Sequence, residues 1–339
     1  MTLSEKIGSN GKLIVGVGSA LIDILAREDD AFLDKTGAVK GGMTYVEKQV
    51  IDYTVSMATL TPSVVPGGSA CNTMVGIGRL GGNACFVGKC GNGPMGALFR
   101  TDLKRQNVTP RLFDSDAPTG RVLSIITPDA QRSMFTFLGA SAETRPDEIG
   151  PHCFESASIV HIEGYLLFNR DLMHAVLKAA RAVGAAVCLD LASFNVVAEA
   201  ADILPGLVAE HVDILIANED EALAYTGIRD EECAIRAMAE HVELAVLKLG
   251  SRGSLIAHNG DILKVPARGD GGAVDTTGAG DLWAAGFLYG LVNNWPLEAC
   301  GELGSLCGYE VCQIMGAHIP DERWTEIQKR LKTEWPKSD

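Results

Sequence analysis

The sequence lacks the features that mark disulfide-stabilised, membrane-spanning or nucleic-acid-binding proteins. None of its nine cysteines forms a C-x-x-C pair, which favours free thiols in a reducing cytosol and predicts a cytoplasmic protein. Residues 1–12 lack the apolar core of a signal peptide, and no apolar run approaches the length of a membrane span. The 29 basic residues are outnumbered by 43 acidic ones, and the formal charge of −14 opposes nucleic-acid and anionic-membrane partners. The seven histidines follow no metal-binding spacing, so we expect no structural metal.

A regular alternation of strand-like and helix-like segments is present instead. The 339 residues, 47% of them hydrophobic, suffice for one large α/β domain with a smaller appendage. Apolar runs typical of buried strands alternate with amphipathic segments, which predicts a doubly wound, mostly parallel sheet. Strands are expected at 13–17, 84–88, 159–163, 186–191, 213–217 and 245–250, and helices at 94–106, 170–183 and 201–210.

A predicted hairpin interrupts this alternation. Two β-rich runs, 120–127 and 132–138, are joined by a short polar turn. We expect the hairpin to join segments 20–27 and 41–46 in a small second sheet that acts as a lid. Because unpaired strand edges also favour association between chains, the same sheet is compatible with a homodimer interface.

Residues 274–281, Val-Asp-Thr-Thr-Gly-Ala-Gly-Asp, carry the strongest chemical signal. They precede the apolar run 282–292, so a glycine-rich turn is expected to open a buried helix. The N–H groups of Gly278, Ala279 and Gly280 would lack intrahelical partners at the positive end of the helix dipole, which suits an anion. Asp281 would then be placed to accept a proton from an attacking hydroxyl, a geometry that favours phosphoryl transfer. The alternative is an ordinary turn with Asp281 as a helix cap.

Two further segments favour the binding of hydroxyl groups. Asp23 interrupts an apolar stretch after the first strand, where its carboxylate can hold paired sugar hydroxyls or bond to nearby backbone. Gly67 and Gly68 lie at a strand-to-helix turn and allow close approach of a ligand, and Asn72 offers a donor and an acceptor on the first helical turn. For this second segment the alternative is a tight turn with a cap.

Three other polar residues suit a phosphate or its cation. Asn218 and Glu221 follow a predicted strand and share a helix face, so they suit a Mg²⁺ ion held through water, although first-turn acids are also common caps. Arg132, at the return of the hairpin, is a candidate phosphate clamp or an exposed turn arginine.

Together these motifs resemble the ribokinase-like (PfkB) family of sugar and nucleoside kinases over nearly the whole chain. The segment Gly67-Gly68-x-x-x-Asn72, the motif Asn218-x-x-Glu221 and the more specific run 275–281 occur in the family's order. Segments 18–23, 67–69, 132–134 and 163–165 look most similar to the adenosine kinase branch. The resemblance implies one ribokinase-like domain over 1–339, a three-layer α/β/α fold with a mostly parallel sheet, and a lid formed by segments 20–27, 41–46 and 120–138.

The resemblance also implies roles for individual residues. Asp281 would be the base, the N–H groups of Gly278, Ala279 and Gly280 the anion hole, and Arg132 the arginine that approaches the phosphates. The residues implied to bind the acceptor are Ser19, Asp23, Gly67, Gly68, Asn72 and Tyr165. Those implied to bind ATP are Asn218, Glu221, Lys248, Gly250 and Thr277. Asn218 and Glu221 would hold Mg²⁺ through water, and a K⁺ site would lie beside Asp275 and Thr277.

Two classes of function remain open at this point. One is an ATP-dependent kinase that phosphorylates a primary hydroxyl, and the other is a ligand-binding regulatory relative without turnover. An intact base beside an intact anion hole favours the kinase. A purine acceptor needs a flat apolar wall, for which the candidates are Met43, Tyr45, Phe137, Leu138 and Tyr165, unless these side chains fill the core of the lid. We expect an adenosine-like nucleoside, with a free sugar such as ribose or fructose as the alternative.

Overall fold

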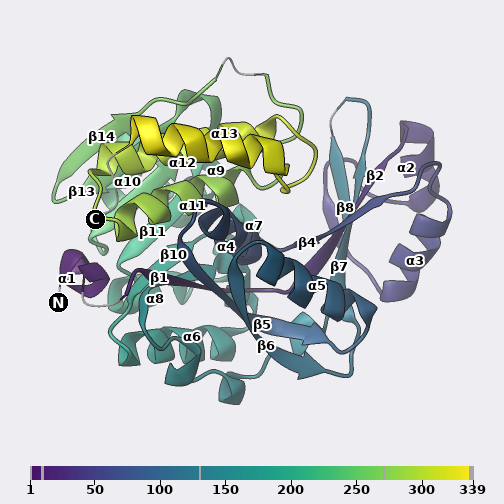
Figure 1. Cartoon of the computed structure of the whole chain (residues 1–339), viewed down its shortest axis with the longest axis horizontal. Helices are drawn as coiled ribbons and strands as arrows, with labels where there is room; N and C mark the ends of the chain where they lie inside the picture. Colours follow the sequence, from purple (N-terminus) through teal and green to yellow (C-terminus); the bar gives the residue numbers. More distant parts are fainter. Residues whose placement is uncertain (1, 9–10, 130, 270–271, 336–339) are drawn as a thin grey trace.

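Two β-sheets of unequal size organise the chain. The computed structural model describes residues 2–8, 11–129, 131–269 and 272–335. Figure 1 shows the large sheet covered by helices in one body, with the small sheet standing beside it. No helix within the described ranges is long and apolar enough to cross a membrane.

The large sheet is mostly parallel, as the sequence predicts. Within the described residues it has nine strands in the order β14-β13-β12-β11-β10-β9-β1-β5-β6. β1 pairs in parallel with β5 and β9, and the antiparallel pairs of the described sheet are β12 with β13 and β13 with β14. The strands are β1 (Leu13–Val17), β5 (Asn83–Gly91), β6 (Val108–Ser115), β9 (Ala157–Glu163), β10 (Ala186–Asp190), β11 (Ile214–Asn218), β12 (Leu244–Lys248), β13 (Ser254–His258) and β14 (Asp261–Val265).

Helices cover both faces of this sheet because its strands are apolar on both sides. In β1, Ile14 packs on one face and Val15 on the other. The first face is covered by α1 (Leu3–Gly8), α4 (Ser69–Arg79), α5 (Pro94–Arg105), α11 (Ala279–Val292), α12 (Leu297–Cys312) and α13 (Asp321–Glu334). The second is covered by α6 (Arg170–Ala182), α7 (Phe194–Glu199), α8 (Leu204–His211), α9 (Glu219–Thr226) and α10 (Glu231–Met238).

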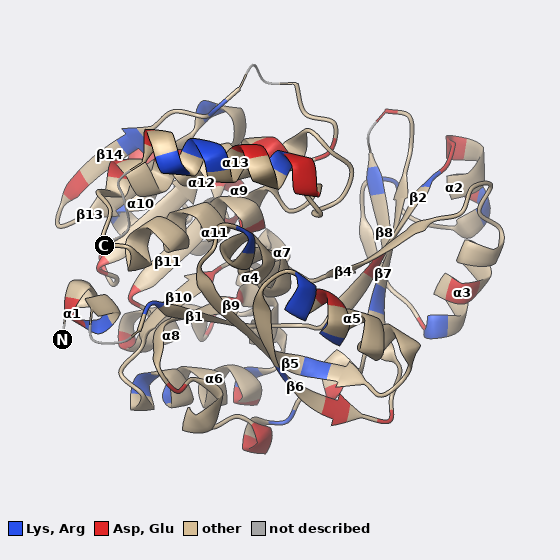
Figure 2. Ribbon diagram, viewed as in Figure 1, with Lys and Arg blue, Asp and Glu red and all other residues tan. Residues whose placement is uncertain are grey.

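Helix α11 lies in the core, whereas α13 lies at the surface. Ten of the 14 residues of α11 are buried, and its one charged residue is Asp281 in the first turn. Figure 2 shows charges of both signs along α13. The expectation that a glycine-rich turn opens a buried helix near residue 282 therefore agrees with the structure.

The small sheet contains the segments that the sequence predicts, together with one that it does not. Its order is β3-β8-β7-β2-β4. The strands are β2 (Leu21–Arg27), β3 (Met43–Tyr45), β4 (Ser63–Gly67), β7 (Thr119–Ile126) and β8 (Arg132–Gly139), accompanied by α2 (Asp30–Thr36) and α3 (Lys48–Ser56). The hairpin is formed by β7 and β8. The added strand is β4, which pairs antiparallel with β2 and places its last residue, Gly67, beside α4.

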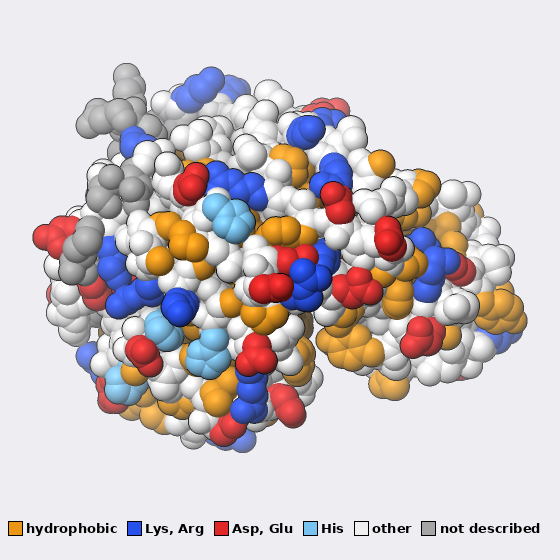
Figure 3. Space-filling view, turned by 90° about the horizontal axis from the view of Figure 1, so that it is seen from below, with side chains coloured by type: hydrophobic (Ala, Val, Ile, Leu, Met, Phe, Trp, Pro, Cys, Tyr) orange, Lys and Arg blue, Asp and Glu red, His pale blue; other side chains and the backbone are white. Residues whose placement is uncertain are grey.

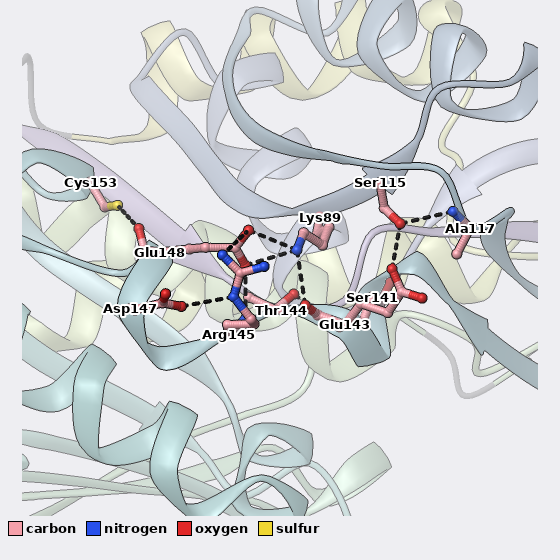
Figure 4. Close-up of polar contacts among 10 residues, drawn as sticks. All are labelled: Lys89, Ser115, Ala117, Ser141, Glu143, Thr144, Arg145, Asp147, Glu148 and Cys153. Atoms are coloured by element: carbon pink, nitrogen blue, oxygen red, sulfur yellow. Dashed lines mark hydrogen bonds and ion pairs between the residues drawn. The ribbon is translucent and has the colours of Figure 1, made fainter.

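A buried ion pair holds the segment that leads from the small sheet back to the large sheet. After β8 the chain makes three short 3₁₀ turns, η1 (Ala140–Glu143), η2 (Pro146–Glu148) and η3 (Pro151–Cys153). Lys89, on β5, donates to the Glu143 carbonyl at 2.9 Å and forms an ion pair with Glu148 at 2.7 Å (Figure 4). Because Lys89 is only 3% exposed, this contact fixes the return segment against the large sheet.

Candidate active site

A cleft of about 940 Å³ separates the small sheet from the carboxyl ends of the parallel strands. Figure 3 shows a notch between the larger and smaller lobes of the molecule. Ligands of open parallel sheets bind at this edge, because the loops that follow the strands diverge there. β9, β10, β11 and β12 end there with Glu163, Asp190, Asn218 and Lys248, all of which line the cleft.

Asp281 is held by two side chains of helix α4. Its Oδ1 accepts a hydrogen bond from Ser69 Oγ at 2.8 Å, and its Oδ2 accepts one from Asn72 Nδ2 at 2.9 Å. Burial raises the pKa of Asp281, while the two donors oppose that rise. The carboxylate is therefore fixed in orientation at the start of α11 and faces the cleft. The sequence predicts that Asn72 binds a hydroxyl of the acceptor. In the structure its side-chain amide donates to Asp281 instead.

The turn before α11 has the backbone geometry that glycine permits. Gly278 caps the helix at φ 75°, and a Cβ on it would lie 2.6 Å from that of Ala317. A Cβ on Gly280 would lie 3.1 Å from Lys248 Nζ, so a cation stands next to the first turn of the helix. The Ala279 N–H already donates to the Thr276 carbonyl at 3.1 Å.

A network of hydrogen bonds organises the loop before this turn. Asp275 Oδ1 accepts from Thr277 N and Oγ1, and Oδ2 accepts from Gly316 N at 2.9 Å. Although burial opposes it, these donors lower the pKa of Asp275. Arg132 reaches across from β8 and donates to Thr277 Oγ1, so the small sheet contacts the glycine-rich loop directly.

Lys248 forms a buried ion pair beneath the same turn. Its Nζ lies 2.9 Å from Asp190 Oδ2, and the two side chains are 14% and 6% exposed. Burial opposes the charge, but the fields of Asp190 and Glu221 hold the pKa of Lys248 above its ordinary value. The lysine is therefore charged, and its positive charge lies close to the start of α11.

Asn218 and Glu221 form a reciprocal cap on helix α9. Asn218 Oδ1 accepts from Glu221 N at 2.9 Å, and the Glu221 carboxylate accepts from Asn218 N at 2.8 Å and Nδ2 at 2.7 Å. The two residues therefore cap the helix, which is the alternative to a Mg²⁺ site that the sequence left open. Both residues also line the cleft. Burial raises the pKa of Glu221 to about 7.

Two further carboxylates that line the cleft lie against glycines. A Cβ on Gly67 would fall 2.2 Å from Asp23 Oδ2, and Gly68 at φ 101° passes close to the Ser19 carbonyl. Burial raises the pKa of Asp23 to about 7, with Arg132 opposing the rise. The Glu163 carboxylate accepts hydrogen bonds from the backbone N–H groups of Ser19 at 2.8 Å and Ala70 at 3.1 Å. Burial raises the pKa of Glu163 to about 7 as well.

Four of the five apolar wall candidates line the cleft, whereas Phe137 follows the alternative and packs against the core. Met43, Tyr45, Leu138 and Tyr165 are lining residues. On β8 the side chains alternate between the two faces, so Arg132, Met134, Thr136 and Leu138 point into the cleft while Phe137 packs against the hydrophobic core.

Other departures from the expected site concern Gly250, Ser69, Glu163 and Asp190. Gly250 lies exposed in the turn η5 (Gly250–Arg252), outside the residues that line the cleft. Ser69, Glu163 and Asp190 line it without having been expected. Glu163 and Asp190 carry the same signal as Asp23, a carboxylate beside an apolar strand run, and the same reasoning would have found them.

The raised pKa of Asp23 predicts how stability depends on pH. Because the folded protein holds this proton up to about pH 7 and the unfolded chain releases it near pH 3.8, the contribution is full below about pH 4 and is lost as pH rises through 7. We expect the free energy of unfolding to fall by on the order of 1 kcal/mol per pH unit for each such carboxyl. Urea unfolding from pH 4 to 8 should show a shallower decline for Asp23→Asn than for the exposed control Asp34→Asn. Identical declines would contradict the assignment.

Comparison with known proteins identifies the family. The model of the pfkB family carbohydrate kinases matches residues 31–324. The chain belongs to this family. It is a phosphotransferase with an alcohol acceptor, a kinase of carbohydrates or nucleosides. Kinases of this family use ATP and typically Mg²⁺.

Individual relatives of this pfkB kinase have different descriptions. An adenosine kinase structure from Sinorhizobium meliloti is 32% identical with a TM-score of 0.86, covering 94% of this chain and 99% of that one. A probable sugar kinase structure from Rhizobium etli is 30% identical with a TM-score of 0.87, covering 95% and 99%. A 5-dehydro-2-deoxygluconokinase from Geobacillus thermodenitrificans is 28% identical, covering 73% and 78%. The predicted family, fold class and enzyme class are confirmed.

Proposed function

We propose that this pfkB kinase transfers the γ-phosphoryl group of ATP to the primary hydroxyl of a nucleoside such as adenosine. The observation that carries the proposal is the position of Asp281. Its carboxylate stands in the first turn of α11, fixed by Ser69 and Asn72, beside Lys248 and a glycine turn that Arg132 contacts. A base and an anion-binding turn thus meet at one point of the cleft.

The proposed chemistry follows from this arrangement. Asp281 accepts the proton of the acceptor hydroxyl as that oxygen attacks the phosphorus atom. Charge that develops on the transferred group is met by N–H groups of the glycine turn, where Gly278 and Gly280 line the cleft, and by Lys248 and Arg132. Since Arg132 comes from the small sheet and already contacts Thr277, the small sheet would act as a lid that keeps this arginine in the site and excludes water.

A nucleoside acceptor is favoured by apolar side chains that line the cleft together with the hydroxyl-binding residues. Asp23 and Gly68 lie where a ribose diol would bind, and Met43, Tyr45, Leu138 and Tyr165 offer apolar surface for a base. Met43 is 42% and Tyr45 51% exposed, so these side chains are available to a ligand. The adenosine kinase from S. meliloti supports the same choice. A free sugar remains the second candidate, supported by the R. etli relative.

The donor set fits a Mg²⁺ ion held through water. Among the described residues no three His, Cys, Asp or Glu side chains converge as metal ligands, and both Glu221 oxygens already accept hydrogen bonds from Asn218. Mg²⁺ retains several waters and binds phosphates, so Glu221 would accept from that water shell. The bound ion would neutralise phosphate charge. For K⁺, the proposed place is beside Asp275 and Thr277, where the loop of the anion-binding turn would be stiffened.

Replacing Glu221 by glutamine is expected to raise the Mg²⁺ concentration needed for half-maximal rate by roughly tenfold, because a neutral amide holds the water shell less strongly. The measurement is initial rate against free Mg²⁺ at constant MgATP. Glu219→Gln, an exposed change in the same helical turn, serves as the control. An unchanged titration for Glu221→Gln would leave this residue as a cap only.

The proposed function is tested by the position of the new phosphate. The protein is incubated with MgATP and adenosine or fructose, and the product is examined by ³¹P–¹H NMR. We expect a phosphate ester on the primary carbon and stoichiometric ADP. Binding of both ligands without ADP release would instead indicate a regulatory relative.

A further inference from the structure

One wall of the cleft is formed by a segment with little regular structure. Residues 140–149, the return segment, follow β8 and contain the turns η1 and η2. Ser141, Ala142, Thr144 and Ile149 of this segment line the cleft. Because the hydrogen bonds within short 3₁₀ turns have poor geometry, the position of this wall depends on contacts with other parts of the protein.

Lys89 binds the return segment at two points. Its Nζ donates to the Glu143 carbonyl at 2.9 Å, where η1 ends, and to Glu148 Oε2 at 2.9 Å, where η2 ends (Figure 4). The Lys89 side chain is 4% exposed and that of Glu148 is 15% exposed. Although burial opposes it, the Lys89 ammonium lowers the pKa of Glu148. Thr144, which lines the cleft, therefore lies between two residues that one buried cation holds.

Lys89 stands on a part of β5 that extends past β1. The pairing of β1 with β5 ends at Val87, whereas β6 accompanies β5 as far as Gly91. The turn η1 packs against this extension of β5. Ser115, the last residue of β6, donates from its Oγ to the Glu143 carboxylate. The return segment is thus held from two adjacent strands of the large sheet.

The return segment lies beside residues proposed to bind the acceptor. Ser141 Oγ donates to the Ala20 carbonyl at 3.1 Å, and Ala20 leads directly into β2, which carries Asp23. In the large sheet, four strands separate the strand of Lys89 from β12, which carries Lys248 beside the glycine turn. A change at Lys89 should therefore affect the space for the acceptor before it affects the phosphate-binding turn.

We propose that Lys89 is a positioning residue for the acceptor, because its contacts with Glu143 and Glu148 set the wall of the cleft against which the acceptor packs. This inference rests on the proposed function of the cleft. Lys89 itself is not among the residues that line the cleft, so it acts through the return segment. The wall would contact the acceptor both before and during phosphoryl transfer, and its displacement should weaken binding more than it slows the chemical step.

The first test removes the cation and measures both substrates separately. Lys89→Met keeps an unbranched side chain without the ammonium group. Initial rates are measured with MgATP and adenosine, or with fructose or ribose if a free sugar reacts faster. We expect the KM for the acceptor to rise roughly tenfold, while kcat and the KM for MgATP stay within about threefold of the wild-type values.

Lys6→Met serves as the matched control. Lys6 is also buried and forms an ion pair with Asp213, which directly precedes β11. Neither residue lines the cleft. This change removes a buried cation of comparable exposure, so it should lower stability while leaving the KM values for both substrates unchanged.

A double variant separates positioning from stability. Lys89→Met leaves the Glu148 carboxylate without its cation, and adding Glu148→Gln removes that charge and should restore part of the lost stability. The Glu143 carbonyl still lacks the lysine, so the KM for the acceptor should stay raised. Hydrogen exchange in residues 140–149 should be faster than in the wild-type protein for both Lys89 variants, but not for Lys6→Met.

A milder variant keeps the test available if Lys89→Met does not fold. Ser115→Ala removes the hydroxyl that binds Glu143 and should raise the KM for the acceptor about threefold. An unchanged KM for the acceptor in the folded variants, or one that recovers together with stability in the double variant, would overturn the inference and leave the kinase assignment intact. Absence of wild-type turnover with every acceptor would overturn the proposed function and with it this inference.

Discussion

Asp281→Asn is expected to lower kcat by roughly 10² to 10⁴, because the amide cannot accept the proton of the attacking hydroxyl. The change preserves the size of the side chain, and Ser69 and Asn72 remain beside it. Binding of the acceptor should therefore persist within a few-fold. Rates and acceptor affinities would be measured for both proteins across pH 5 to 9.

The pH profile separates a base from a helix cap. Since burial raises the pKa of Asp281, wild-type kcat should rise as this group loses its proton, and the residual rate of Asp281→Asn should lack that limb. Asp321→Asn removes a first-turn acid from α13, outside the cleft, and should leave kcat nearly unchanged. Near-normal turnover by Asp281→Asn over the whole range would show that the residue only caps α11.

Lys248→Met is expected to lower the free energy of unfolding by about 3–5 kcal/mol, because it leaves Asp190 buried without its cation. Lys248 Nζ and Asp190 Oδ2 are 2.9 Å apart, and both side chains are almost fully shielded from water. Glu221 is also affected, since it shares the field of the same lysine. Denaturant unfolding at pH 7.5 measures the loss.

Two controls separate the buried pair from lysine loss in general. Lys40→Met removes an exposed pair with Asp30 and Asp129 and should cost less than about 1 kcal/mol. Lys248→Met combined with Asp190→Asn should regain part of the lost stability, because the carboxylate that lacked a partner is no longer charged. A loss under 1 kcal/mol for Lys248→Met alone would contradict the account of this pair.

Much of the large sheet could be predicted from the sequence because its strands are continuous apolar runs separated by helical segments. The run before Asn218 and the run before Lys248 are examples. Strand β6 could not be predicted in this way, because Thr109, Pro110 and Arg111 break the apolar pattern and its place at the sheet edge tolerates them.

The partners of the site residues were less predictable than the residues themselves. The sequence places Asn72 on a helix and Asp281 on another, but their contact depends on how α4 and α11 pack. That packing requires Gly76, where a Cβ would lie 2.5 Å from Ala285 Cβ. Such a long-range approach leaves no local pattern in the sequence. The same holds for β4, whose pairing with β2 joins distant segments.

The central claim, a kinase that prefers a nucleoside, is tested most directly by kcat/KM for MgATP-dependent phosphorylation of adenosine, other nucleosides, ribose and fructose under one set of conditions. We predict that adenosine or another nucleoside exceeds both free sugars by at least tenfold, about 1.4 kcal/mol in transition-state binding. A tenfold preference for ribose or fructose would contradict the nucleoside assignment, and no turnover of any acceptor would contradict the proposed function.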